Sequence, residues 1–228
     1  MRTPFAWVAA LLLLGAAAPS PIDSQVVLAR YATALANLAP AKNVVFTYGV
    51  SQAGPHNIEQ THRIYRSGER VRDETLSIDG QGLKRKVTRI ARYADRYAIE
   101  RLAPRESEYT FLFLRATRDG ARFRYTYEAI PAMKSAFVVR TVTIDGASYL
   151  PAKITFRTSN GSIDGAGEVD YARVGAHWVP TLAQVTATMN AKPARERIAF
   201  SAYAFPARLP PSTFAPPRPL PSLVHPKP

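Results

Sequence analysis

From residue 43 onward the chain alternates apolar and polar residues with a period of two, and tight-turn sequences interrupt this alternation at intervals. Phe46, Tyr48 and Val50 fall on one side of such a segment, because successive side chains of a strand point to opposite faces. Asp119-Gly120 separates two of the segments and is of the type that favours a two-residue β-turn. The pattern predicts roughly ten or eleven antiparallel strands.

One amphipathic helix precedes these strands. Its apolar residues recur at helical spacing over residues 24–38, Asp23 or Ser24 is suited to cap its start, and Pro40 ends it. Such an apolar stripe has to lie against an apolar surface, most simply the sheet. We therefore predict a mainly β (α+β) fold, a strongly curved antiparallel sheet or incomplete β-barrel with the N-terminal helix packed on its concave side.

Two later parts of the chain are less regular. Residues 84–92 and 96–102 are predicted to form a further hairpin that turns near Ala94-Asp95. From Pro206 onward proline is frequent, and proline cannot donate a hydrogen bond to a sheet. Residues 209–214 carry apolar side chains that would attach them to the sheet, whereas the residues after them are predicted to be a disordered tail.

The first 20 residues are predicted to be a secretory signal peptide. Met1-Arg2 supplies positive charge, residues 5–14 form a near-unbroken apolar run, and small residues follow at 15–18. The run is too short to cross a bilayer of about 30 Å, and no cysteine follows it to carry a lipid anchor. The predicted boundaries are 1–20 for the signal peptide, whose cleavage point stays open, 21–214 for the folded domain and 215–228 for the tail. The predicted location is periplasmic or secreted.

The net charge of +13 has three explanations. A general basic bias, an anionic membrane surface and nucleic acid each fit it. The bases of residues 84–92 alternate with apolar residues, which places them on one solvated strand face. No nucleic-acid-reading motif is present, so we expect no nucleic acid as partner. Lys84, Arg85 and Lys86 are the candidate residues for docking on an anionic membrane.

No arrangement of residues in the sequence predicts catalysis or metal binding. The chain has no cysteine and four histidines, and its acids are dispersed, so the residue spacings of zinc and calcium sites do not occur. His62 lies on a predicted strand without an acidic or histidine neighbour at ligand spacing. We predict a protein that is not an enzyme and uses no cofactor or metal; an unrecognised hydrolase is the third choice of function.

Apolar and aromatic side chains are in excess on the middle strands. Phe111 and Phe113 share one face while Leu112 and Leu114 take the other, so the sheet carries apolar groups on both sides. Apolar concavities with few polar groups are the usual form of a ligand site. The candidate ligand-binding residues, all expected on the concave face, are Phe46, Tyr48, Ile64, Phe111, Phe113, Phe123, Tyr125, Tyr127, Phe137, Val139, Phe156 and Trp178.

Three stretches of the sequence resemble the LolA/LolB-like superfamily of envelope proteins. The first is residues 35–48, where the helix gives way to the first strand. The second is residues 149–156 leading to residues 169–180, and is similar to the family pattern LP-x-x-I followed by Y-x-x-V-x-G-x-W-x-P, with a glycine placed slightly differently. The third is residues 202–214.

This resemblance implies an incomplete barrel, closed by a helix, whose inside binds the acyl chains of lipids or lipoproteins. The predicted function is an exported envelope protein that binds a hydrophobic ligand in the concavity of the sheet, as a carrier or in lipoprotein sorting. The alternative is a regulatory or scaffold module that binds another envelope protein. The expected partner is a lipid or an acylated protein, followed by an anionic membrane surface or an envelope protein, and the chain is expected to be a monomer.

Overall fold

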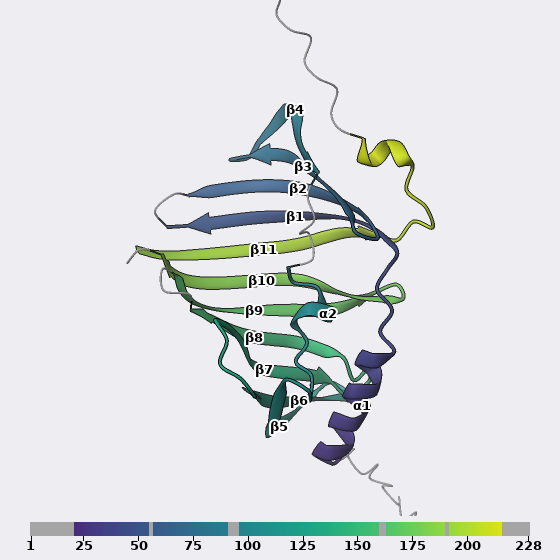
Figure 1. The fold of residues 1–228 in the computed structure, drawn as a ribbon, viewed down its shortest axis with the longest axis vertical. Coiled ribbons are helices and arrows are strands. Elements are labelled where there is room, and N and C mark those ends of the chain that lie inside the picture. The colour runs from purple at the N-terminus through teal and green to yellow at the C-terminus, as the bar shows by residue number, and fades with distance from the viewer. Residues whose placement is uncertain (1–20, 55–56, 91–95, 160–162, 190–191, 216–228) are drawn as a thin grey trace, which may run out of the picture.

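Eleven strands form one antiparallel sheet in the computed structural model (Figure 1). The structure describes residues 21–54, 57–90, 96–159, 163–189 and 192–215. In chain order the elements are α1 (Ser24–Ala36), β1 (Asn43–Ala53), β2 (Ile58–Ser67), β3 (Arg70–Ile78), β4 (Gln81–Ile90), α2 (Ile99–Leu102), β5 (Tyr109–Asp119), β6 (Arg122–Pro131), β7 (Phe137–Asp145), β8 (Pro151–Ser159), β9 (Ile163–Val174), β10 (His177–Met189), β11 (Lys192–Ala204) and the 3₁₀ helix η1 (Pro211–Phe214).

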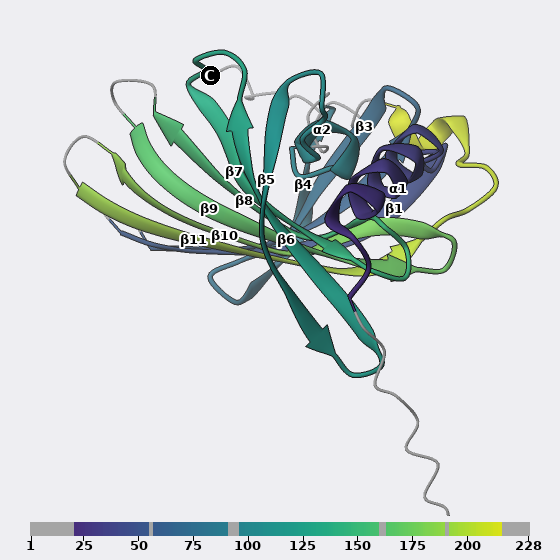
Figure 2. The same cartoon turned by 90° about the horizontal axis from the view of Figure 1, so that it is seen from below.

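The sheet is built from two meanders, β1 to β4 and β5 to β11. Its strand order is β4-β3-β2-β1-β11-β10-β9-β8-β7-β6-β5, and the pairing of β1 with β11 joins the two meanders. β4 and β5 stand at opposite edges, so the sheet is open. It twists and curves around a hollow (Figure 2), as expected of a long antiparallel sheet. The predicted mainly β fold with a curved, unclosed antiparallel sheet is confirmed.

Helix α1 lies in the hollow of the curved sheet (Figure 2). The Asp23 carboxylate caps it by accepting hydrogen bonds from the N–H groups of Gln25 (2.8 Å) and Val26 (3.4 Å), which satisfies donors that have no partner within the helix. The apolar stripe predicted from the sequence is buried, and its members are Val27, Leu28, Tyr31 and Leu35.

Tyrosine hydroxyls attach α1 to its surroundings. The Tyr127 hydroxyl on β6 donates to the Ser24 carbonyl at 2.8 Å, and the Tyr31 hydroxyl donates to the Pro104 carbonyl at 2.8 Å. The Tyr31 ring also meets Phe111 of β5 edge to face, with ring centroids 6.0 Å apart. The helix is thus fixed by contacts with β5, β6 and Pro104, which are far away in the sequence.

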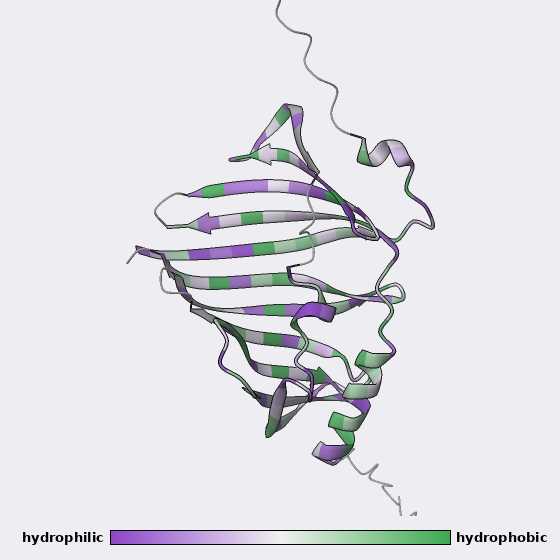
Figure 3. Cartoon of the chain, in the orientation of Figure 1, coloured by the Kyte–Doolittle hydropathy of each residue, from purple (hydrophilic) through white to green (hydrophobic). Residues whose placement is uncertain are grey.

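The buried side chains form two clusters on the concave side. The larger joins α1 and α2 to the strands from β6 to β11. The smaller lies on β1 to β3 and consists of Val44, Phe46, Ile64 and Val71. Figure 3 shows the alternation of apolar and polar residues along the strands, which is the period-two pattern from which the sheet was predicted.

The second predicted hairpin is wrong. β4 ends at Ile90, and the segment predicted as its partner contains the short helix α2 instead. Ile99, Leu102 and Ala103 are buried, a spacing of three and four residues that suits a helical turn as well as a strand end. The predicted turn at Ala94-Asp95 lies outside the described residues.

The chain after β11 crosses to the outer face of β3. There the Arg72 guanidinium donates to the Thr213 carbonyl at 2.7 Å, and the Arg70 guanidinium lies 4.8 Å from the centre of the Phe214 ring. The predicted attachment of residues 209–214 to the sheet is therefore observed at η1. Residues 216–228, the greater part of the predicted tail, lie outside the described residues.

Candidate functional site

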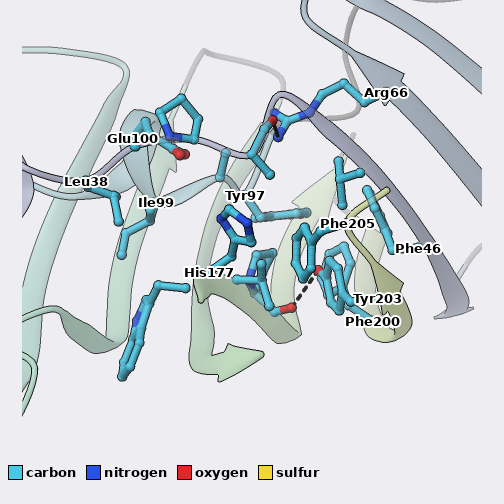
Figure 4. A pocket seen from close by; sticks show the side chains of 18 residues that line it. Leu38, Phe46, Arg66, Tyr97, Ile99, Glu100, His177, Phe200, Tyr203 and Phe205 are labelled. Carbon is cyan, nitrogen blue, oxygen red and sulfur yellow. Dashed lines mark hydrogen bonds between the residues drawn. The ribbon is translucent and has the colours of Figure 1, made fainter. Parts of the chain in front are cut away.

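An apolar pocket of about 60 Å³ opens on the concave side, between the loop that follows α1, helix α2 and the strands β1, β10 and β11 (Figure 4). Leu38 and Ile99 lie on one side of it, with Tyr97 and His177 between them and the opposite wall (Figure 4). That opposite wall is aromatic and consists of Phe46, Phe200, Tyr203 and Phe205. Segments from both ends of the chain thus meet at this pocket.

Ring contacts hold the aromatic wall in place. Phe46 stacks on Tyr203 with centroids 5.2 Å apart, and Phe205 contacts the His177 ring at 4.2 Å. Phe200 meets Tyr97 edge to face at 6.1 Å. Such pairs contribute about 0.5–1.5 kcal/mol each beyond their buried area, so this wall is a preformed surface.

Two of the polar side chains that line the pocket are hydrogen-bonded to backbone carbonyls of the protein, while Arg66, Glu100 and His177 also belong to its lining. The Tyr203 hydroxyl donates to the Pro180 carbonyl at 2.8 Å, and the Trp178 indole N–H donates to the Pro151 carbonyl at 2.6 Å. Burial raises the pKa of the Tyr203 phenol. Burial also raises the pKa of the Tyr97 phenol, and the nearby Glu196 carboxylate adds to the effect. The neutral phenols leave a surface suited to hydrocarbon rather than to a charged group.

The residues predicted to bind a ligand are spread over four kinds of place. Phe46 and Trp178 line the pocket, and Tyr48 stacks on His62. Phe113 and Phe137 remain exposed at the rim of the sheet. The remainder pack in the two core clusters or against them: Ile64, Phe111, Phe123, Tyr125, Tyr127, Val139 and Phe156. Whether any of the twelve contacts a ligand stays a prediction.

Sequence reasoning missed most of the pocket wall. Phe200, Tyr203 and Phe205 sit at the end of the last strand and just beyond it. Tyr203 and Phe205 alternate and were available as a signal, whereas Phe200 lies three residues before Tyr203 and reaches the same wall because the backbone is irregular at Ala202 (φ 51°). Ile99 was assigned to a strand, and its place in α2 against the pocket had no sequence signal.

A polar cluster occupies the concave face of β1 to β3. The His62 Nδ1 lies 2.8 Å from the Asp73 carboxylate, and the Tyr48 hydroxyl donates to the same carboxylate at 3.3 Å. His62 Nε2, which would have to face a nucleophile in a hydrolase triad, faces the Gln60 amide oxygen at 3.1 Å. Strand pairing thus gives His62 an acidic neighbour, Asp73, that the spacing of residues in the sequence does not reveal. The cluster nevertheless does not have the geometry of a triad.

The candidate membrane-docking residues belong to the edge strand β4. The side chains of Lys84 and Lys86 are exposed, and that of Arg85 lies outside the described part of the structure. Within the described residues, no cluster of three or more acidic, histidine or cysteine side chains suits a metal ion, and no helix has the length and apolar character of a membrane span.

No family model and no curated protein sequence matches the chain. Solved structures do match. A LolA superfamily protein from Nitrosomonas europaea has 11% identity and a TM-score of 0.41, with 86% of this chain and 99% of that chain covered. A domain described as an outer membrane lipoprotein-sorting protein from Vibrio parahaemolyticus has 14% identity and a TM-score of 0.47, with 84% and 97% covered.

The Pseudomonas aeruginosa complex of MucA and MucB is also similar, at 13% identity, a TM-score of 0.24, and coverage of 77% of this chain and 92% of that chain. The strand pairing of this chain itself establishes its fold.

Proposed function

We propose that this protein is an exported binding protein that holds the hydrocarbon part of a lipid or of an acylated protein in the β1–β11 pocket, the apolar pocket described above. The observation that carries the proposal is the composition of that pocket. Its aromatic wall is preformed, and the Tyr203 hydroxyl and Trp178 indole N–H are engaged with backbone carbonyls of the protein rather than directed at a ligand. A pocket of this kind favours hydrocarbon over polar or charged ligands.

The pocket has to enlarge for a whole acyl chain to enter. Its volume of about 60 Å³ equals the share of about two water molecules in the liquid, whereas ligand pockets are commonly about 300–1,000 Å³. The short helix α2 is the wall best suited to move, because it is four residues long and no side chain caps its start. Re-exposing Ile99 costs about 1.5–3 kcal/mol, which about two to four methylene groups offset on burial.

The alternative, a regulatory or scaffold module for another envelope protein, has one observation in its favour. α1 and α2 pack their side chains against the strands from β6 to β11, and the pocket between α2 and the strands β1, β10 and β11 is small. A protein that works through its outer surface would keep that packing unchanged. The two functions therefore differ in whether α2 moves.

The test is native mass spectrometry of the full chain, purified from an export-competent host, before and after addition of a palmitoylated peptide or palmitic acid. We expect near-stoichiometric binding by the wild type. Ala98→Phe places a phenyl ring in the pocket and is expected to abolish binding. Ala32→Phe, a matched change on the exposed side of α1, is expected to leave binding intact. A wild type that stays free of lipid, or equal binding by both variants, would overturn the proposal in favour of the alternative.

A further inference from the structure

The edge strand β5 exposes more apolar surface than a free edge normally does. In the described part of the chain, β6 is the strand that pairs with β5, and no strand pairs with its other edge. Leu112, Phe113 and Leu114 are 53%, 41% and 48% exposed. A long edge strand with exposed apolar side chains is a template for pairing with another strand.

The opposite edge of the sheet has a different character. β4 presents exposed Lys84 and Lys86, and lysines on an edge strand oppose pairing with a further strand. One edge of this open sheet is therefore protected and the other is not. This difference also gives the basic residues of β4 a role that needs no membrane.

Backbone groups of β5 are available at this edge. The Glu108 carbonyl points toward β6, where it accepts a hydrogen bond from the Ala132 N–H at 2.8 Å. In an antiparallel strand the backbone groups of alternate residues point to the same side. Phe111 and Phe113 therefore direct their N–H and C=O groups to the open edge.

The two ends of β5 carry opposite charges, so two antiparallel copies of the strand would be complementary to each other. Glu106 and Glu108 precede the strand, Arg115 and Arg118 lie in its second half, and all four are exposed. Arg105 precedes the two acids, and Asp119 at the other end is paired with Arg124 at 2.7 Å. When two copies of β5 run antiparallel, the acidic end of each copy faces the basic end of the other. A pairing centred near Leu112 would bring the apolar segment of each copy against that of the other.

We propose that β5 is a self-association surface, through which two copies of this chain pair edge to edge in a dimer with two-fold symmetry. The contact uses the same strand on both copies, so it closes on itself and does not propagate. The protected β4 edge prevents the head-to-tail pairing of β4 with β5 that would build a filament. The proposed dimer differs from the monomer expected from the sequence and does not require a ligand.

The test uses two charge-inverted variants of the full chain and sedimentation velocity over a concentration series. Arg115→Glu with Arg118→Glu makes both ends of β5 acidic, and Glu106→Arg with Glu108→Arg makes both ends basic. Each variant alone is expected to raise the dimer dissociation constant by about tenfold or more, because like charges then face each other. An equimolar mixture of the two is expected to restore a dimer.

The matched control is Lys84→Glu with Lys86→Glu, which inverts two exposed charges at the other edge. It is expected to leave the dimer unchanged, because glutamates keep the β4 edge charged and so still oppose its pairing. Amide exchange at Phe111 and Phe113 is expected to slow at concentrations where the dimer forms. A dimer that both charge-inverted variants retain, or a mixture of the two variants that fails to associate, would overturn the proposal. A wild type that is monomeric at all concentrations would also overturn it and would leave this edge for a different protein or a membrane.

Discussion

Substitution of Gly167 by alanine tests how the floor of the hollow is packed. Gly167 lies on β9 opposite Phe156 of β8, and the Phe156 ring crosses the space that a side chain at 167 would need. A Cβ atom at this position would lie 2.5 Å from Phe156 Cζ and 2.9 Å from the Gln184 carbonyl oxygen. Carbon atoms in contact are about 3.5–4.0 Å apart, so the ring has to move by about 1 Å or more.

The expected cost follows from that displacement. Phe156 is 6% exposed and belongs to the larger core cluster, where a ring has little room to move. Overpacking a core costs about 1–3 kcal/mol, which corresponds to roughly 2–4 °C in melting temperature per kcal/mol for a domain of this size. We therefore expect Gly167→Ala to lower the free energy of unfolding by about 1–3 kcal/mol.

Urea unfolding of three further variants completes this experiment. A Cβ at Gly82 on β4 would have no atom within 4 Å, so Gly82→Ala is the matched control and is expected to be neutral or slightly stabilising. In a Phe156→Leu background the added methyl group meets a shorter side chain, and the cost of Gly167→Ala is expected to fall. Equal costs at the two glycines, or an unchanged cost in the Phe156→Leu background, would refute this account of the packing.

Two further predictions concern stability. Burial raises the pKa of Tyr127 to about 12 and also raises the pKa values of Tyr31 and Tyr171; the folded state therefore keeps these protons above about pH 10, where the unfolded state loses them. The free energy of unfolding should not depend on these groups below pH 10, and above it should fall by about 1.4 kcal/mol per pH unit for each tyrosine. Urea unfolding at pH 8, 10 and 11 measures this, and the absence of such a fall would contradict the burial of the phenols. Asp23→Ala removes the cap of α1 and should cost about 0.5–2 kcal/mol, whereas Asp23→Asn should restore most of it in the same measurement, and equal losses for both would argue against capping.

The strands were predictable because one physical rule produces both the sequence pattern and the structure. A sheet that buries one face requires alternation, and the pairing of β5 with β6 follows directly from the turn Asp119-Gly120 readable in the sequence. The pairing of β1 with β11, which joins the two meanders, had no local signal, because it joins segments about 150 residues apart. Such a long-range pairing follows from the burial of the whole concave face of the sheet.

The candidate site was less predictable than the fold. Alternation identifies the side chains that point into the hollow, and Phe156, Tyr127 and Trp178 all satisfy it. It does not distinguish side chains that are buried in the core from those that line a free pocket, because that depends on what packs against the sheet. Phe156 and Tyr127 are buried in the larger core cluster, whereas Trp178 reaches the pocket.

Helix α2 shows a second limit of sequence reasoning. Four residues give too short a stretch to separate a helical from a strand pattern. Its position over the pocket is set by the burial of Ile99 and Leu102 among side chains from distant strands. Tertiary contacts of this kind override local propensity in short segments.

The central claim is that hydrocarbon enters the β1–β11 pocket, and quenching of Trp178 fluorescence tests it most directly. Trp178 lines the pocket, and the other tryptophan, Trp7, lies in the predicted signal peptide, so Trp7→Phe is needed only where that segment is retained. Titration with a dibrominated fatty acid is predicted to give saturable quenching that Ala98→Phe abolishes. Unquenched Trp178 at saturating probe, or the same quenching in Ala98→Phe, would contradict the claim.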